Sequence, residues 1–145
     1  MQGTEIFAPF FGMLVLTFIV WAVMYSRRIN WIIKNKINTQ DLNTPEKGAA
    51  IAPESVSFPS HNFRNLFEMP VIFYALCLYL FVTGSVDSTY MTSAWVFLVF
   101  RSIHSAIHCT VNIVRLRFLT YMIATFVLWF MLFRAALDFL PTLST

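Results

Sequence analysis

Long apolar runs alternate with polar connections along the chain, and the runs approach the length needed to cross a bilayer. The first run, 6–25, reads IFAPFFGMLVLTFIVWAVMY and contains no charged residue. Further runs are predicted over 61–82, 93–114 and 118–137. Because about 20 apolar residues span the hydrocarbon core, the pattern predicts an all-α, integral membrane four-helix bundle that forms a single domain.

The connections between these runs differ in length and composition. The segment 26–60 is polar; we expect its first part to continue the helix and its proline-broken second half to form a loop. The segment 83–92 is a short connection, and RLR at 115–117 is expected to be a tight basic joint. The first run is preceded by acidic Glu5 and followed by basic residues, so we interpret it as a retained helix and not as a cleaved signal peptide.

The basic residues are distributed unevenly between the two ends of the predicted helices. Eight of the ten lie in or beside the connections 26–60 and 115–117, namely Arg27, Arg28, Lys34, Lys36, Lys47, Arg64, Arg115 and Arg117. The other end holds Glu5, Asp87 and Asp138, with Arg134 as its basic residue. The positive-inside rule therefore predicts that both termini lie on the non-cytosolic side. The same rule accounts for the net charge of +3 without a nucleic-acid partner.

The composition supports a membrane protein. Hydrophobic residues make up 58% of the chain and charged residues 12%, against about 25% charged residues in soluble domains. Cys77 and Cys109 both fall within apolar segments, so we expect buried thiols and no disulfide.

Two of the predicted spans carry polar residues at helical spacing. In the span 93–114 they form one stripe, because three- and four-residue steps return to the same helix face; the stripe comprises Arg101, His104, His108, Asn112 and Arg115. In the span 61–82 the shared face holds His61, Arg64, Asn65 and Glu68. Lipid offers such groups no partners, so the two faces should meet each other or line a cavity. Glu68 and Arg101 are predicted to form an ion pair.

Three interpretations of these polar faces are open. They can line a functional cavity, which we favour, or they can simply join helices. A metal or haem site is the third, since His104 and His108 are four residues apart and Glu68, Cys109 or His61 could complete it. We assign no metal ligand, because an HxxxH pair alone is a weak signal. Motifs for hydrolase nucleophiles, nucleotide phosphates and redox CxxC pairs are absent from the sequence.

Three short motifs resemble those of one membrane family. RNLFE at 64–68 is similar to R-N-x-x-E, and RSIHSAIH at 101–108 is similar to R-x-x-H-x-x-x-Y. RLRFLTY at 115–121 resembles a basic joint followed by a tyrosine. Together with the predicted topology, these motifs resemble the MAPEG superfamily, the membrane-associated proteins in eicosanoid and glutathione metabolism, over about 58–134.

The resemblance implies a homotrimer that binds glutathione as co-substrate between subunits, on the cytosolic side. It implies catalytic Arg117, which would stabilise the glutathione thiolate, and a structural pair of Glu68 and Arg101. The implied glutathione-binding residues are Arg28, Arg64, Asn65, Glu68, His104, His108 and Tyr121. The expected activity is conjugation or reduction of lipophilic electrophiles or hydroperoxides, with membrane lipids and a lipophilic small molecule as further partners. The short loops favour a bacterial inner membrane over a eukaryotic endomembrane.

The chain departs from the family pattern at several positions. His108 stands where the family usually has tyrosine, and Pro70 follows Glu68 more closely than the family's proline does. Phe118 after Arg117 offers no hydroxyl, and Arg115 competes with Arg117 for the thiolate role. The family also includes a non-catalytic, lipid-binding member, so a lipid-binding or scaffold protein of the same fold is the alternative function.

Overall fold

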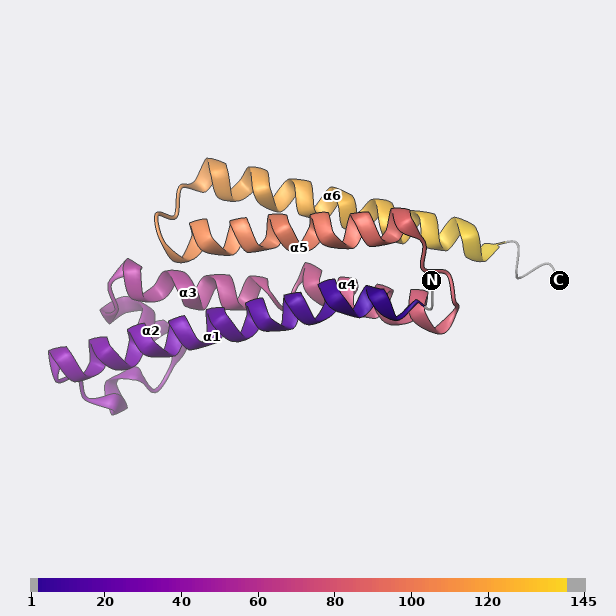
Figure 1. The fold of residues 1–145 in the computed structure, drawn as a ribbon. Helices are drawn as coiled ribbons and strands as arrows, with labels where there is room; N and C mark the ends of the chain where they lie inside the picture. Colours follow the sequence, from indigo (N-terminus) through magenta and orange to yellow (C-terminus); the bar gives the residue numbers. More distant parts are fainter. Residues whose placement is uncertain (1–2, 141–145) are drawn as a thin grey trace.

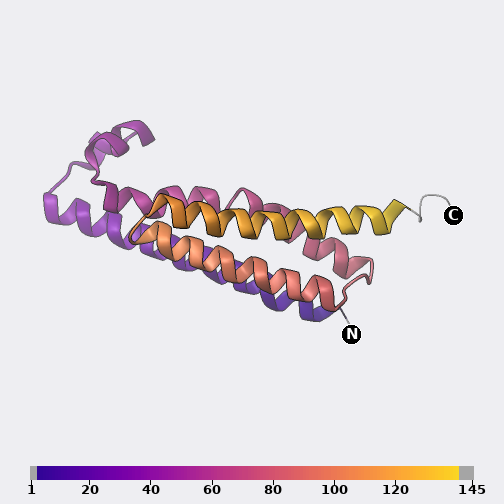
Figure 2. The ribbon, with the colours of Figure 1, turned by 90° about the horizontal axis from the view of Figure 1, so that it is seen from above.

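The chain folds into long helices that lie side by side (Figures 1 and 2). The computed structural model describes residues 3–140, and this part contains no strand. Three long helices are α1 (Phe7–Asn35), α5 (Ser88–Cys109) and α6 (Val114–Phe139). A fourth rod consists of two successive helices, α3 (Glu54–Asn65) and α4 (Met69–Val82). The start of α1 and the end of α6 lie at the same end of the bundle (Figure 1).

Three of the rods are long and apolar enough to cross a membrane. Within residues 3–140 these are Thr4–Asn35, Glu54–Val82 and Val114–Phe139. The predicted all-helical membrane fold is thereby confirmed. The helix α5 has 22 residues and is less apolar, because the polar stripe lies on it. It packs against α1, α3 and α6, which shield its buried polar groups.

The first helix is longer than the apolar run that predicted it. At about 1.5 Å per residue, its 29 residues reach roughly 43 Å, beyond the ~30 Å hydrocarbon core. The helix ends at Asn35, and the capping residue Lys36 adopts a positive φ of 52°. The stretch expected to be loop contains η2 (Thr39–Leu42), α2 (Pro45–Ile51) and the start of α3. Thr44 caps α2, because its side-chain oxygen accepts a hydrogen bond from the Lys47 N–H at 3.3 Å.

The α5–α6 joint is earlier than the basic tripeptide predicted for it. Helix α5 ends at Cys109 and not at 114, and α6 begins at Val114, so 115–117 form the first turn of α6. The turn 110–113 is closed by the Asn112 N–H, which donates to the Ile107 carbonyl at 2.8 Å. Asn112 has a φ of 48°, a conformation that asparagine tolerates better than most residues.

The packing of the helices depends on one close approach and on aromatic contacts. A Cβ atom on Gly12 would lie 2.5 Å from Leu98 Cδ2, so glycine allows α1 to approach α5 closely. The Phe73 and Phe97 rings stack between α4 and α5 with centroids 4.5 Å apart, and both side chains are fully buried. These contacts fix α5 against α1 and α4.

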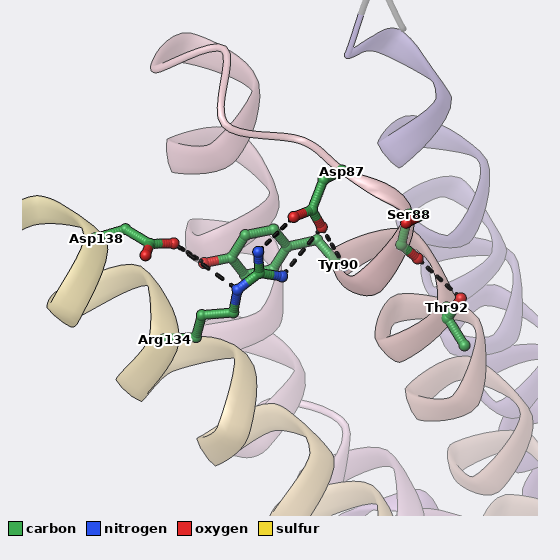
Figure 3. A network of polar contacts seen from close by, with 6 residues as sticks. All are labelled: Asp87, Ser88, Tyr90, Thr92, Arg134 and Asp138. Atoms are coloured by element: carbon green, nitrogen blue, oxygen red, sulfur yellow. Dashed lines mark hydrogen bonds and ion pairs between the residues drawn. The ribbon is translucent and has the colours of Figure 1, made fainter.

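A polar clamp closes the end of the bundle at the start of α5 (Figure 3). Arg134 of α6 forms an ion pair with Asp87 and a longer one, 3.9 Å, with Asp138. Its guanidinium lies over the Tyr90 ring, and the Tyr90 hydroxyl donates to Asp138 Oδ2 at 3.0 Å. Asp87 also caps α5 by accepting from the Tyr90 N–H at 2.9 Å. The hydrogen bond from Arg134 lowers the pKa of the Asp87 carboxyl.

Candidate functional site

The polar stripe on α5 is buried inside the bundle. Arg101 is fully buried, and His104, Ser105 and His108 are also buried. Arg101 Nη2 donates to the Asn65 carbonyl at 3.1 Å, whereas Nε and Nη1 have no hydrogen-bond partner among the described residues. A buried guanidinium with two unsatisfied nitrogens is costly. Such a group is typical of a site completed by a ligand or by another chain.

A helix break explains why Arg101 binds a main-chain carbonyl. Pro70 cannot donate to the carbonyl four residues earlier and its ring clashes there, so the rod breaks between Asn65 and Met69. At the break the Asn65 carbonyl loses its α-helical partner; it accepts from the Glu68 N–H at 3.4 Å and from the Arg101 guanidinium at 3.1 Å. A cation at a helix C-terminus also interacts favourably with the helix dipole.

The ion pair predicted between Glu68 and Arg101 is not formed. Within residues 3–140 the ion pairs are those of Arg134. Glu68 is exposed, and its Oε2 accepts a hydrogen bond from Asn65 Nδ2 at 2.7 Å. The two residues are therefore linked through Asn65, whose carbonyl binds Arg101 and whose amide binds Glu68.

The two histidines of the stripe lie next to the start of α6. His104 Nδ1 lies 2.9 Å from the Arg117 carbonyl, which can only accept, so this nitrogen carries the proton. His104 Nε2 and His108 Nδ1 have no partner within the described chain. The two rings are nearly perpendicular, with centroids 5.5 Å apart, and the Tyr121 ring lies 5.7 Å from His104.

Five of the predicted site residues thus come together between α5 and α6; they are Arg101, His104, His108, Arg117 and Tyr121. We call them the α5–α6 cluster. Arg117 is half-buried, and its Nη1 donates to Asn112 Oδ1 at 2.6 Å. Arg115 is exposed and has no such contact. Of the two arginines, Arg117 is therefore the one placed for the thiolate role that the resemblance implies.

The other predicted site residues lie elsewhere in the subunit. Arg28 and Arg64 line a cavity of about 260 Å³ between α1, α2 and α3, together with Trp31, Glu46 and His61. We call it the loop-side cavity. Its walls contain no residue of the α5–α6 cluster. Asn65 and Glu68 are at the helix break and do not line the cavity.

Two further polar residues were missed by sequence reasoning. Asn62 is fully buried; its Nδ2 donates to Cys109 Sγ at 3.4 Å, and its Oδ1 accepts from Ser105 Oγ at 3.3 Å. Arg27 Nη1 donates to the carbonyls of Cys109, at 2.7 Å, and Ser55, at 3.2 Å. The sequence did hold a signal for Asn62, because it lies three residues before Asn65 and so on the same helix face. The role of Arg27 depends on contacts between elements that are distant in the sequence, so no local signal indicates it.

The metal interpretation has no third ligand in the structure. Residues 3–140 contain no group of three or more His, Cys, Asp or Glu side chains placed to hold a metal ion. Both cysteines are free and buried. His104 uses one ring nitrogen for the Arg117 carbonyl, which leaves one nitrogen for any other partner.

The helices and the buried polar centre define an integral membrane protein built as a helical bundle. The family model described as MAPEG family matches residues 6–137, nearly the whole chain. The chain therefore belongs to the MAPEG family, a superfamily of membrane proteins of glutathione and eicosanoid metabolism. No curated protein and no solved structure matches the chain significantly.

Proposed function

We propose that this protein binds glutathione and joins it to, or uses it to reduce, a lipophilic electrophile or hydroperoxide. The observation that carries this proposal is the α5–α6 cluster, where two arginines and two histidines gather and, among residues 3–140, form no ion pair with a carboxylate. Glutathione offers two carboxylates and a thiol that reacts as the thiolate. Arginine suits both groups, because it stays charged and binds carboxylates through two parallel hydrogen bonds.

In the proposed mechanism Arg117 lies beside the glutathione sulfur. A neighbouring cation lowers the pKa of a thiol, so the proton leaves to solvent and the thiolate remains. The thiolate then attacks an electrophilic carbon: a sulfur–carbon bond forms while a leaving group departs as an anion, or while the electrons of a conjugated double bond shift and the resulting anion takes a proton from solvent. With a hydroperoxide the thiolate attacks the terminal oxygen, the oxygen–oxygen bond breaks to release the alcohol, and a second glutathione completes the reaction to glutathione disulfide and water. His104, His108 and Tyr121 would contact the peptide, and Arg28 and Arg64 would hold a carboxylate at one of its ends. Asn65 and Glu68 would contribute contacts at the helix break.

The proposed site is completed by a neighbouring subunit. In one subunit the loop-side cavity and the α5–α6 cluster have no lining residue in common. A homotrimer, the assembly that the family resemblance implies, would place the cavity of one subunit against the cluster of the next. We also propose that this end faces the cytosol, as the basic residues indicate, and that the membrane is a bacterial inner membrane.

A non-catalytic lipid-binding function is the second candidate, and an apolar groove favours it. A groove of about 340 Å³ lies between α4 and α6, lined by apolar residues such as Ile72, Leu76, Leu132 and Phe139. In a bilayer this groove would face hydrocarbon, so an acyl chain or a lipophilic substrate suits it. The groove lies toward the end of α6, away from the loop-side cavity.

Thiolate formation separates the two candidates. The protein is purified in detergent, glutathione is added at millimolar concentration, and the ultraviolet absorbance of the thiolate is measured against pH. We expect a thiolate signal near neutral pH, and its loss in Arg117→Ala, because the variant lacks the stabilising cation. Arg115→Ala is the matched control and should keep the signal. Wild-type protein that binds no glutathione would contradict the proposal and leave the lipid-binding alternative.

A further inference from the structure

The loop-side cavity has a mixed charge pattern that the roles assigned so far do not use. Arg28 and Arg64 line it from α1 and α3, and Glu46 lines it from α2. None of these three side chains forms an ion pair or hydrogen bond with another described residue. The cavity is therefore lined by two cations and one anion that do not form ion pairs with one another.

The helix α2 holds Glu46 over this space. A Cβ atom on Gly48 would lie 3.5 Å from Arg28 Nη2, so the backbone of α2 passes close to the Arg28 guanidinium. The Thr44 cap and Pro45 at the first helical position start the helix just before Glu46. Glu46 is thus positioned by a regular helix next to a basic residue of α1.

The charge pattern matches one kind of chemical group. An α-carboxylate suits the two guanidinium groups, and an α-ammonium suits a carboxylate. The cavity volume of about 260 Å³ is below the roughly 300 Å³ at which pockets begin to enclose whole drug-sized ligands. The cavity is therefore sized for one end of a peptide and not for all of it.

We propose that Glu46 binds the α-ammonium group of the amino-acid end of the ligand, while Arg28 and Arg64 bind its α-carboxylate. This inference rests on the proposed function, in which the ligand is glutathione. The family resemblance implied Glu68 as the carboxylate among the glutathione-binding residues. In the structure Glu68 is exposed, accepts a hydrogen bond from Asn65 and does not line the cavity. Glu46 is the carboxylate that shares the cavity with the two arginines.

The test compares two probes on matched variants. Binding of glutathione and of its analogue without the α-amino group is measured by equilibrium dialysis in detergent, with wild type, Glu46→Gln and Glu54→Gln. Glu46→Gln should weaken glutathione binding about tenfold, since a charge-assisted hydrogen bond is lost, and should leave binding of the analogue unchanged. Glu54→Gln should change neither, because Glu54 is exposed and outside the cavity.

Each other outcome contradicts the proposal in a different way. If Glu46→Gln binds glutathione as tightly as wild type, this inference fails and the proposed function stands. If Glu46→Gln weakens both probes equally, Glu46 acts on the shape of the cavity and not on the ammonium group. If wild type binds neither probe, the inference and the proposed function both fail.

Discussion

At the scale of single residues, arginines bind main-chain carbonyls beside prolines. Pro59 lies inside α3 and cannot donate to the Ser55 carbonyl, and Arg27 donates to that carbonyl instead. Pro70 breaks the rod after α3, and Arg101 donates to the Asn65 carbonyl at that break. Carbonyls left unpaired within a membrane cost several kcal/mol each. Arg27 therefore satisfies a carbonyl that Pro59 leaves open, whereas Arg101 adds a second donor to the Asn65 carbonyl, which also accepts from the Glu68 N–H at 3.4 Å.

The neighbouring residues Arg27 and Arg28 provide a test of this structural role. Arg27→Ala should lower the free energy of unfolding by about 2 kcal/mol, since it removes hydrogen bonds from a charged donor to two carbonyls. Arg28→Ala should change it by less than ~0.5 kcal/mol, because Arg28 has no hydrogen bond within the described chain. Thermal or denaturant unfolding in detergent measures both.

Binding supplies the complementary result for this pair. Arg28→Ala should weaken glutathione binding while the protein stays folded, whereas Arg27→Ala that remains folded should bind nearly as wild type does. Equal stability of the two variants would contradict the role given to Arg27.

At the scale of elements, α5 buries its polar face against α3 and α6, while its opposite side exposes apolar residues such as Trp95 and Val99. Its buried face meets α3 and α6 through Asn62, Asn65 and Arg117. Its start is held by the clamp of Asp87, Arg134 and Asp138 (Figure 3). A helix with this many polar groups depends on its neighbours, because lipid would leave those groups without partners. The clamp and the α5–α6 cluster hold its two halves in place.

The clamp predicts a pH dependence of stability. Arg134 lowers the folded-state pKa of Asp87, so its contribution is present above the unfolded value of about 3.9 and is lost as pH falls through the lower folded value. The Asp87 side chain is 41% exposed, so we expect less than ~1 kcal/mol. Asp87→Asn keeps a good helix cap and removes only the charge.

Melting temperatures measured from pH 3 to pH 7 check this contribution. Asp87→Asn should be less stable than wild type near neutral pH, and the difference should shrink below pH 4. Asp41→Asn, in the exposed connection, is the control and should follow wild type throughout. A difference that is constant over this range would show that the Asp87 charge does not stabilise the clamp.

At the scale of the whole molecule, the two ends of the bundle differ in chemistry. The loop-side cavity lies at one end, and the α5–α6 cluster lies in the same half of the bundle. The clamp and the apolar groove lie toward the other end. A polar co-substrate and a lipophilic molecule would therefore approach different surfaces.

Mixed oligomers test whether the site is shared. Arg64→Ala, which disrupts the cavity, and Arg117→Ala, which disrupts the cluster, are co-expressed and compared with each variant alone. If each site joins the cavity of one subunit to the cluster of its neighbour, random trimers should recover about a quarter of the wild-type thiolate signal. Native mass spectrometry of the same sample checks for three subunits. No recovery in confirmed mixed trimers would contradict a shared site.

The pattern of apolar and polar residues determined much of this protein by itself. Apolar runs of membrane length predicted the helices, since the hydrocarbon core sets how many apolar residues a span requires. Three- and four-residue spacing placed Arg101, His104 and His108 on one face, and the structure buries all three. Three short motifs were sufficient to indicate the family, because their order and their positions on the predicted helices follow the family pattern.

Only the tertiary structure decided which of these groups meet. Residue spacing does not say where a break, a turn or a close approach lies, so the α5–α6 joint was predicted too late in the chain. The roles of Arg27 and Asn62 depend on residues more than forty positions away, and no local pattern reports such contacts. Packing likewise separated Arg28 and Arg64 from the α5–α6 cluster and placed Glu46 beside them, because the fold of the connection determines which charges share a cavity.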